Sequence, residues 1–149
     1  MEISDELYRE VVLDHYRDPR HHGKMESPDI LEWGKNPLCG DELALYLAVK
    51  NGKIADIQFD GKGCSISQAS ASMMTASVLG KSFSDVKDIV SSFKGMMIEG
   101  KSAEDLPLDL EDAKSLEGVR KYPVRIKCAL LSWNTLLEAL KKLEERKAA

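Results

Sequence analysis

Three cysteines and one aspartate are the residues of this 149-residue chain that could form a reactive site. Cys39 lies in a loop, Cys64 and Cys128 lie at predicted helix starts, and Asp41 follows the first cysteine by two residues. The free N–H groups and the dipole at a helix start favour a thiolate over a thiol. Three sulfurs and one carboxylate oxygen would form a tetrahedral set suited to Zn²⁺, or to an iron–sulfur cluster with one exchangeable corner.

Spacing alone leaves a second interpretation open. The cysteines are 25 and 64 residues apart and include no Cys-x-x-Cys pair. Cysteine is among the most often buried residues, so three inert core thiols are the alternative. The glycines beside Cys39 and Cys64 favour a shared site, because flexible loops are poor places to bury a side chain. An odd cysteine count without a secretory signal indicates reduced thiols, and we expect a cytoplasmic protein.

The three histidines are weaker candidates for ligands. His15 lies on the apolar stripe of the first predicted helix, where we interpret it as a core or capping histidine, with metal ligation as the alternative. His21 and His22 are adjacent and flanked by basic residues, which favours a solvated loop over a metal site. We therefore leave the histidines out of the predicted site.

Apolar residues at helical spacing and capping signals predict four helices that position the cysteines. They span residues 3–17, 65–79, 84–97 and 123 onward. Ser65 and Gln68 match a capping box at the start of the second helix, and Ser84 is the expected cap of the third. Cys64 and Cys128 then lie just before and just inside two helix starts.

Alternating apolar residues predict one β-hairpin over residues 42–60. A three-residue loop, 50–52, would pair Leu47 with Ala55 and Leu45 with Ile57, whereas a two-residue turn would mix the two faces. Residues 19–41 hold three prolines and three glycines, so we predict an irregular, extended stretch there.

Length and charge restrict the class of protein. The chain is expected to form a single domain over residues 1–149. Its net charge of −4 and pI near 5.4 argue against nucleic-acid binding, and no apolar run is long enough to span a membrane. Residues 99–118 carry seven acidic and two basic side chains, which predicts a solvated acidic insertion at about 99–120 with at most short helices.

Four segments of the chain resemble the U-type iron–sulfur cluster assembly proteins, the IscU, SufU and NifU-like family. They are residues 14–20 (DHYRDPR), 36–41 (NPLCGD), 61–67 (GKGCSIS) and 125–131 (RIKCALL). The resemblance implies an α+β fold with a small antiparallel sheet, helices packed on one face and the three cysteines clustered at one end. It also implies that Cys39, Asp41, Cys64 and Cys128 hold the metal.

Three departures from the IscU branch resemble the SufU branch instead. Lys127 stands where that branch has a histidine, residues 121–125 do not match its chaperone-docking motif, and the acidic insertion lengthens the gap between Cys64 and Cys128. SufU-type proteins are zinc-bound sulfur acceptors. The resemblance thus implies that docking on a SufS-like cysteine desulfurase frees one cysteine ligand, which attacks the enzyme's persulfide.

Several roles follow from this resemblance as expectations. Cys39 is the expected persulfide acceptor because its loop can move more easily than a helix start, and Arg125 would compensate the negative charge of the site. We expect a sulfur carrier rather than a free-standing enzyme; if catalytic, it would be a sulfurtransferase acting with the desulfurase. The alternatives are a scaffold that builds a labile [2Fe–2S] cluster, or holds iron, at the same residues for downstream recipient proteins, and a structural zinc module.

Overall fold

The computed structural model describes residues 2–148, with side chains for residues 7–147. It has the predicted α+β architecture. None of the described helices combines the length and apolar character that crossing a membrane requires. The elements in chain order are α1 (Glu2–Arg17), β1 (Ile30–Asn36), β2 (Asp41–Lys50), β3 (Lys53–Lys62), α2 (Ser65–Val78), α3 (Phe83–Ile98), the short 3₁₀ helices η1 (Ala103–Asp105), η2 (Leu108–Leu110) and η3 (Asp112–Lys121), and α4 (Pro123–Ala148).

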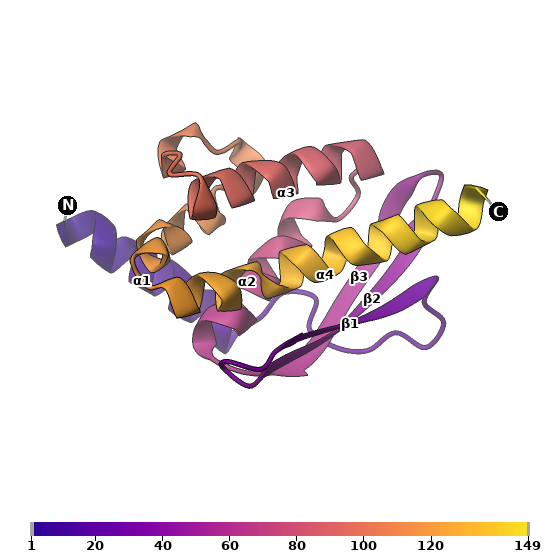
Figure 1. Ribbon diagram of the computed structural model, residues 1–149, viewed down its shortest axis with the longest axis horizontal. Coiled ribbons are helices and arrows are strands. Elements are labelled where there is room, and N and C mark those ends of the chain that lie inside the picture. The colour runs from indigo at the N-terminus through magenta and orange to yellow at the C-terminus, as the bar shows by residue number, and fades with distance from the viewer. Residues whose placement is uncertain (1, 149) are drawn as a thin grey trace.

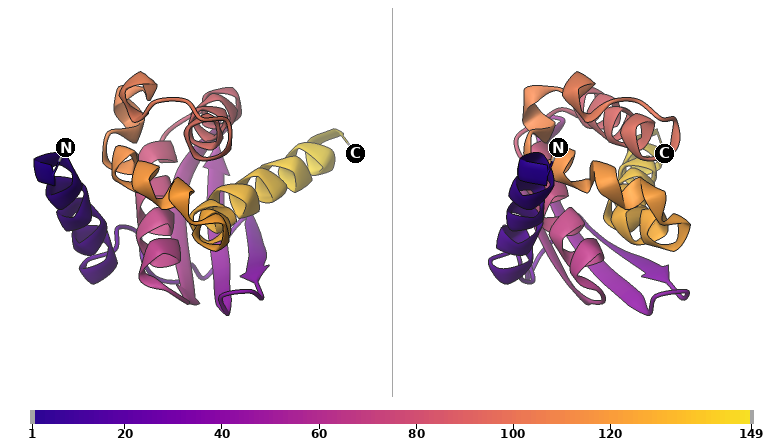
Figure 2. Two further views of the ribbon diagram at one scale, coloured as in Figure 1. Left: turned by 60° about the vertical axis from the view of Figure 1, so that its left-hand side comes forward. Right: turned by 90° about the vertical axis from the view of Figure 1, so that its left-hand side faces the viewer.

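The three strands form one antiparallel sheet in the order β1-β2-β3. Figures 1 and 2 show the helices gathered on one face of this sheet, with α4 crossing it and α1 standing beside α2. Strand β1 lies inside residues 19–41, so the prediction of a wholly irregular stretch was wrong there. Its prolines flank the strand rather than interrupt it, and its pairing with β2 supplies the regular structure.

The hairpin between β2 and β3 corrects the predicted register. The turn is the two-residue Asn51-Gly52, with φ of 55° and 72°, as a type I′ turn requires. Leu47 nevertheless pairs with Ile57, because a bulge beside Ala48 leaves Ala55 without a partner. A bulge inside the strand, rather than a longer loop, thus keeps the apolar faces matched.

The core lies between the sheet and the helices and is centred on the long helix α4. The Trp133 ring stacks on Phe93 with centroids 4.1 Å apart, and its indole N–H donates to Ser70 Oγ at 2.8 Å. Ser70 in turn donates to the carbonyl of Ala129 at 2.6 Å. The small side chains of α2 let α4 pack closely against it. This packing sets the position of the first turns of α4, which carry Cys128.

The capping residue of α2 lies one residue before the predicted one, and that of α3 lies two residues before it. Cys64 caps α2, with its sulfur accepting the N–H of Ser67, so Ser65 is the first helical residue. Ser82 caps α3 in place of Ser84. Both capping residues have the extended backbone of an N-cap, and for α2 the cap places a cysteine sulfur directly at the helix start.

The acidic segment after α3 is folded onto the core. It contains the predicted short helices, but Leu110, Ala113 and Leu116 are fully buried there. The prediction of a solvated segment was therefore wrong for its apolar residues, which repeat at three-residue spacing and face inward, while most acidic side chains stay exposed.

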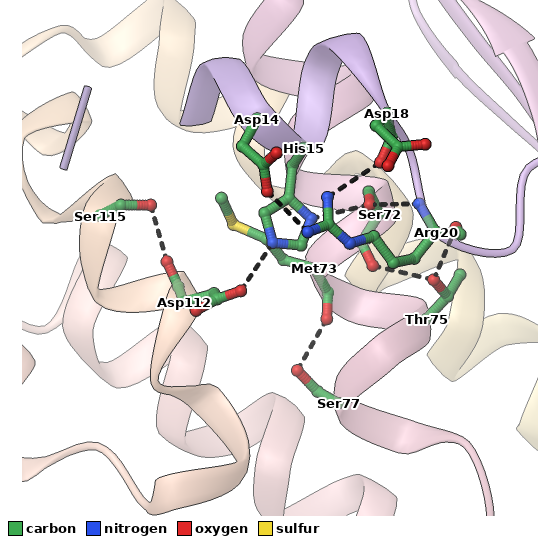
Figure 3. A network of polar contacts seen from close by, with 10 residues as sticks. All are labelled: Asp14, His15, Asp18, Arg20, Ser72, Met73, Thr75, Ser77, Asp112 and Ser115. Atoms are coloured by element: carbon green, nitrogen blue, oxygen red, sulfur yellow. Dashed lines mark hydrogen bonds and ion pairs between the residues drawn. The ribbon is translucent and has the colours of Figure 1, made fainter. Parts of the chain in front are cut away.

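A buried histidine ties this segment to the N-terminal helix (Figure 3). His15, with its side chain 2% exposed, contacts Ser72 Oγ through Nδ1 at 2.7 Å and Asp112 Oδ2 through Nε2 at 2.8 Å. Ser72 also accepts the backbone N–H of Arg20. We call His15, Ser72 and Asp112 the His15 clasp; it joins α1, α2 and η3 and confirms His15 as a core residue.

The two neighbouring histidines contact different elements, His21 the helix α2 and His22 the strand β3. His21 Nδ1 is 3.1 Å from Thr75 Oγ1 on α2, and the exposed His22 ring packs edge-on against Phe59. No described histidine contacts a cysteine sulfur. The loop is therefore held by specific contacts rather than being simply solvated, and the histidines remain outside the predicted site.

Candidate metal centre

Four elements converge at the end of the sheet where β1 turns into β2. Cys39 lies in the loop that joins these strands, and Asp41 is the first residue of β2. Cys64 caps α2 just after β3, and Cys128 is in the second turn of α4. The antiparallel pairing brings the end of β3 beside the start of β2, so residues far apart in the sequence meet here.

Asp41 lies at the centre of this group and is only 1% exposed. Its Oδ1 accepts the backbone N–H of Cys64 at 2.9 Å, and its Oδ2 lies 3.9 Å from the Cys64 sulfur. The side-chain amide of Asn36 lies 3.5 Å from the same Oδ2. One carboxylate oxygen is thus held by the backbone while the other faces the sulfurs.

The remaining sulfurs approach the carboxylate from two other elements. The sulfurs of Cys39 and Cys128 are 2.9 Å apart, and ligand atoms of Cys39, Asp41 and Cys128 all lie within 4.8 Å of one another. The Cys64 sulfur lies beside this group, in contact with Asp41 Oδ2. The structure therefore brings together all four predicted residues and does not disperse the cysteines in separate parts of the core.

The donor set fits a tetrahedral metal. Zinc bound by thiolates at ≈ 2.3 Å places neighbouring ligand atoms about 3.8 Å apart. The separation of 2.9 Å between the sulfurs of Cys39 and Cys128 and that of 3.9 Å between the Cys64 sulfur and Asp41 Oδ2 lie on either side of this value, so small side-chain movements suffice for these pairs. A cation bound here would also stabilise the buried carboxylate, because burying a charge without a counter-charge is costly.

The thiol of Cys128 differs from the sequence-based expectation. Burial raises the pKa of this thiol well above its usual range, and hydrogen bonds with Cys39, Asp41 and Cys64 add to the shift. Its position near a helix start predicted the opposite direction. Desolvation outweighs the helix dipole because Cys128 is only 1% exposed, whereas Cys39 and Cys64 are partly exposed.

An open cleft of about 560 Å³ leads to the sulfurs. Its wall includes all three cysteines and is completed by Ser65, Ile66, Tyr122, Pro123, Val124 and Arg125. The Arg125 guanidinium carbon lies 5.0 Å from the centre of the Tyr122 ring, which holds this cation at the cleft wall. A partner molecule can therefore reach the cysteines from solvent.

Two residues that the sequence reasoning did not assign to the site contact it. Asn36 reaches both Asp41 and the Cys128 sulfur with its amide. Gly63 lies so close that a Cβ there would be 2.2 Å from Asp41 Oδ1, and its φ of +151° disfavours other residues. Both lie in segments that carry the family resemblance, residues 36–41 and 61–67, but a place in such a segment does not show where a side chain points.

Comparisons with known proteins agree with this geometry. The NifU-like N-terminal domain family matches residues 7–128. A zinc-dependent sulfurtransferase, SufU of Bacillus subtilis (strain 168), is 42% identical over 140 residues, which are 94% of this chain and 93% of that protein. An iron–sulfur cluster assembly scaffold protein, IscU of Thermotoga maritima, is 36% identical over 137 residues, covering 92% of this chain and 94% of that protein.

A solved structure extends the likeness to the fold. The N-terminal part of a nitrogen-fixing NifU-like protein from Brucella abortus matches with a TM-score of 0.85 and 25% identity, covering 97% of this chain and 99% of that one. The family match extends from α1 to Cys128 and so includes the cysteine-bearing segments. The chain therefore belongs to the NifU-like N-terminal domain family, the U-type proteins of iron–sulfur cluster assembly.

Proposed function

We propose that this protein accepts sulfur from a cysteine desulfurase at a zinc site formed by Cys39, Asp41, Cys64 and Cys128. The observation that carries the proposal is the convergence of three cysteines and one buried carboxylate at an open cleft. The similarity to a zinc-dependent sulfurtransferase over nearly the whole chain supports the same reaction. Such a site needs reduced thiols, which fits a cytoplasmic location.

The proposed reaction is a thiol–persulfide exchange. The thiolate of Cys39 attacks the outer sulfur of the desulfurase's cysteine persulfide, forming a new S–S bond as the bond to the desulfurase cysteine breaks. The electron pair leaves with the desulfurase thiolate, and Cys39 carries the persulfide. One sulfur atom changes its carrier, so the step requires no outside oxidant or reductant.

Cys39 is the acceptor because it is the least restrained of the three cysteines. It lies in the short β1–β2 loop and is partly exposed at the cleft, whereas Cys128 is buried in a helix. Cys64 is held at the start of α2 by the N–H of Ser67. A loop cysteine can reach a partner's persulfide without disrupting a helix.

Zinc, when bound, would keep the cysteines as thiolates. The neighbouring protein groups then set the charge of the cleft. Arg125 is placed to offset the excess negative charge of three thiolates and one carboxylate, and Lys127 is exposed one residue before Cys128. We assign Arg125 to charge compensation and to attraction of the partly negative persulfide.

A cluster scaffold is the second candidate function. The same four residues can hold a [2Fe–2S] cluster or iron, and one oxygen ligand would make such a cluster labile enough to pass to recipient proteins. The similarity to an iron–sulfur cluster assembly scaffold supports this alternative. Anaerobic reconstitution with iron and sulfide distinguishes the two: a stable visible spectrum supports the scaffold, and tight zinc without colour supports the sulfur acceptor.

A purely structural zinc module is the third possibility. The main cluster of buried apolar side chains comes from the sheet and helices and includes none of the four predicted ligands. We therefore expect the metal-free protein to remain folded with a lower melting temperature. A random-coil circular dichroism spectrum after chelation would support the structural module instead.

The decisive experiment is mass spectrometry of each cysteine after turnover with a cysteine desulfurase and cysteine. The proposal expects one added sulfur atom on Cys39 and faster alanine production in the presence of this protein. Cys39→Ser should abolish both effects while keeping the native circular dichroism spectrum. No added sulfur on any cysteine, together with unchanged alanine production, would overturn the acceptor function.

A further inference from the structure

Asn36 contacts more of the site than any sequence signal indicates. It is the last residue of β1, pairs with Asp41 across the β1–β2 turn, and is 6% exposed. Its carbonyl accepts the N–H of Cys39 at 3.2 Å. Its side-chain nitrogen lies 3.5 Å from Asp41 Oδ2 and 3.6 Å from the Cys128 sulfur. One buried residue thus touches three of the four predicted ligands.

The two amide hydrogens match these two acceptors. An asparagine NH₂ group can donate two hydrogen bonds, and the Asn36 side-chain nitrogen has two acceptors within reach, a carboxylate oxygen and a sulfur. The backbone of Asn36 is paired in the sheet, so this donor reaches both acceptors from a fixed strand. Residues of this kind orient metal ligands and adjust their basicity from outside the ligand set.

The three cysteine sulfurs differ in the hydrogen-bond donors that contact them. Cys64 accepts the N–H of Ser67 at 3.4 Å, and Cys128 accepts from Asn36. Among the described residues, no N–H group donates to the Cys39 sulfur, which accepts only the S–H of Cys128 at 2.9 Å, and this donor is lost when metal binding deprotonates Cys128. A hydrogen bond stabilises negative charge on sulfur, and a stabilised thiolate is a weaker nucleophile.

We infer that Asn36 is a positioning residue that directs the incoming sulfur to Cys39. It holds Asp41 and Cys128 as the fixed side of the metal site and weakens Cys128 as a nucleophile, which leaves Cys39 as the mobile and reactive thiolate. This inference deepens the proposed sulfur-acceptor function and rests on it for the final step. The claim about metal binding stands independently of that step.

Three variants test the inference in the full chain. Asn36→Ala removes both donors, and Asn36→Asp keeps the size of the side chain but replaces its NH₂ group with oxygen. Asn134→Ala is the matched control, because Asn134 is an exposed asparagine on α4 with no hydrogen bond to the four predicted ligands. Circular dichroism and thermal melts establish that each variant is folded; if Asn36→Ala is not, Asn36→Asp carries the test.

The first readout is metal binding without any partner. We expect both Asn36 variants to bind zinc about 10–100-fold more weakly in chelator competition. We also expect the sulfur-to-metal absorption band of the Co²⁺-substituted protein to shift, which a remote loss of stability would not cause. Affinity and spectrum equal to those of Asn134→Ala would overturn the inference.

The second readout is the position of the added sulfur. After turnover with desulfurase and cysteine, we expect the control to carry it on Cys39 and the Asn36 variants to distribute it between Cys39 and Cys128. Sulfur confined to Cys39 in folded Asn36 variants would refute the directing role. If the wild-type chain receives no sulfur at all, the proposed function fails, while the zinc and Co²⁺ measurements still decide whether Asn36 positions the ligands.

Discussion

The His15 clasp and the metal centre both bury polar side chains where distant segments meet, but they differ in how those side chains are satisfied. In the clasp, both ring nitrogens of His15 have partners, and Ser72 also accepts a backbone N–H. In the metal centre, the buried Asp41 carboxylate and the Cys39 and Cys128 sulfurs face one another at 4.8 Å or less.

This difference indicates that the clasp stabilises the fold, whereas the metal centre provides the capacity to bind a ligand. A buried polar group with a full set of partners stabilises one arrangement of the chain, while a carboxylate and sulfurs held together form a donor set that favours a metal cation. The clasp should therefore determine how firmly α1 and η3 are attached. The metal centre should determine what the protein binds, with little effect on whether the chain folds.

Replacing Asp41 should have the largest effect on binding. Asp41→Ala removes the oxygen ligand, and we expect zinc affinity to fall by more than about 100-fold, beyond the loss typical of residues outside the ligand set. Chelator competition measures this. Asp112→Ala, in the clasp, is the matched carboxylate control and should leave zinc affinity unchanged; equal losses in the two variants would contradict the separation of the two regions.

Zinc binding should also strengthen as pH rises. Burial raises the pKa of the Cys128 thiol, so this thiol is protonated at neutral pH without metal and must release its proton on binding. Apparent affinity then increases by about tenfold per pH unit for each proton released. Calorimetry in buffers of different ionisation enthalpy counts these protons, and an affinity independent of pH between 6 and 8 would refute the assignment.

A methyl group at Gly63 should damage the site through its geometry. A Cβ there would meet Asp41 Oδ1 at 2.2 Å in a backbone conformation unfavourable for other residues. We expect Gly63→Ala to lower the free energy of unfolding by about 1–3 kcal/mol and to weaken zinc binding. Gly118→Ala is the control, because a Cβ there meets nothing within 4 Å, and its stability should change by less than about 0.5 kcal/mol.

The smallest effect is expected in the clasp. Asp112→Ala leaves the Nε2 atom of the buried His15 without its partner. Because the Asp112 side chain is 58% exposed and water can partly replace it, we expect a loss of only about 1 kcal/mol in urea unfolding. Hydrogen exchange in α1 should increase selectively. Unchanged exchange there would show that the clasp does not attach the helix.

The sequence predicted the elements better than their ends. The apolar spacing of α1 and α4 located both helices, and Pro123 marked the start of α4. Strand β1 was missed because prolines flank it and Gly34 lies within it, and the hairpin register was missed because a bulge has no distinct residue signature here. Pairing between strands decided both features, and local patterns do not report it.

The sequence predicted which residues would lie close together but not how their contacts are organised. The residue types alone left inert core thiols open as an alternative, and the resemblance to the U-type family joined Cys39, Asp41, Cys64 and Cys128. The hydrogen bonds of Asn36 and the raised pKa of Cys128 depend on burial and on side-chain directions. These arise only when the sheet end and two helix starts are packed together.

The sulfur that caps α2 has a consequence for observing the protein. Cys64 accepts the N–H of Ser67, so the first turn of this helix shares an atom with the metal centre. Any change in electron density on that sulfur alters the amide environment of Ser67, which makes its NMR resonance a built-in reporter. Titrating metal or partner into ¹⁵N-labelled protein while following this single peak will report the occupancy of the site.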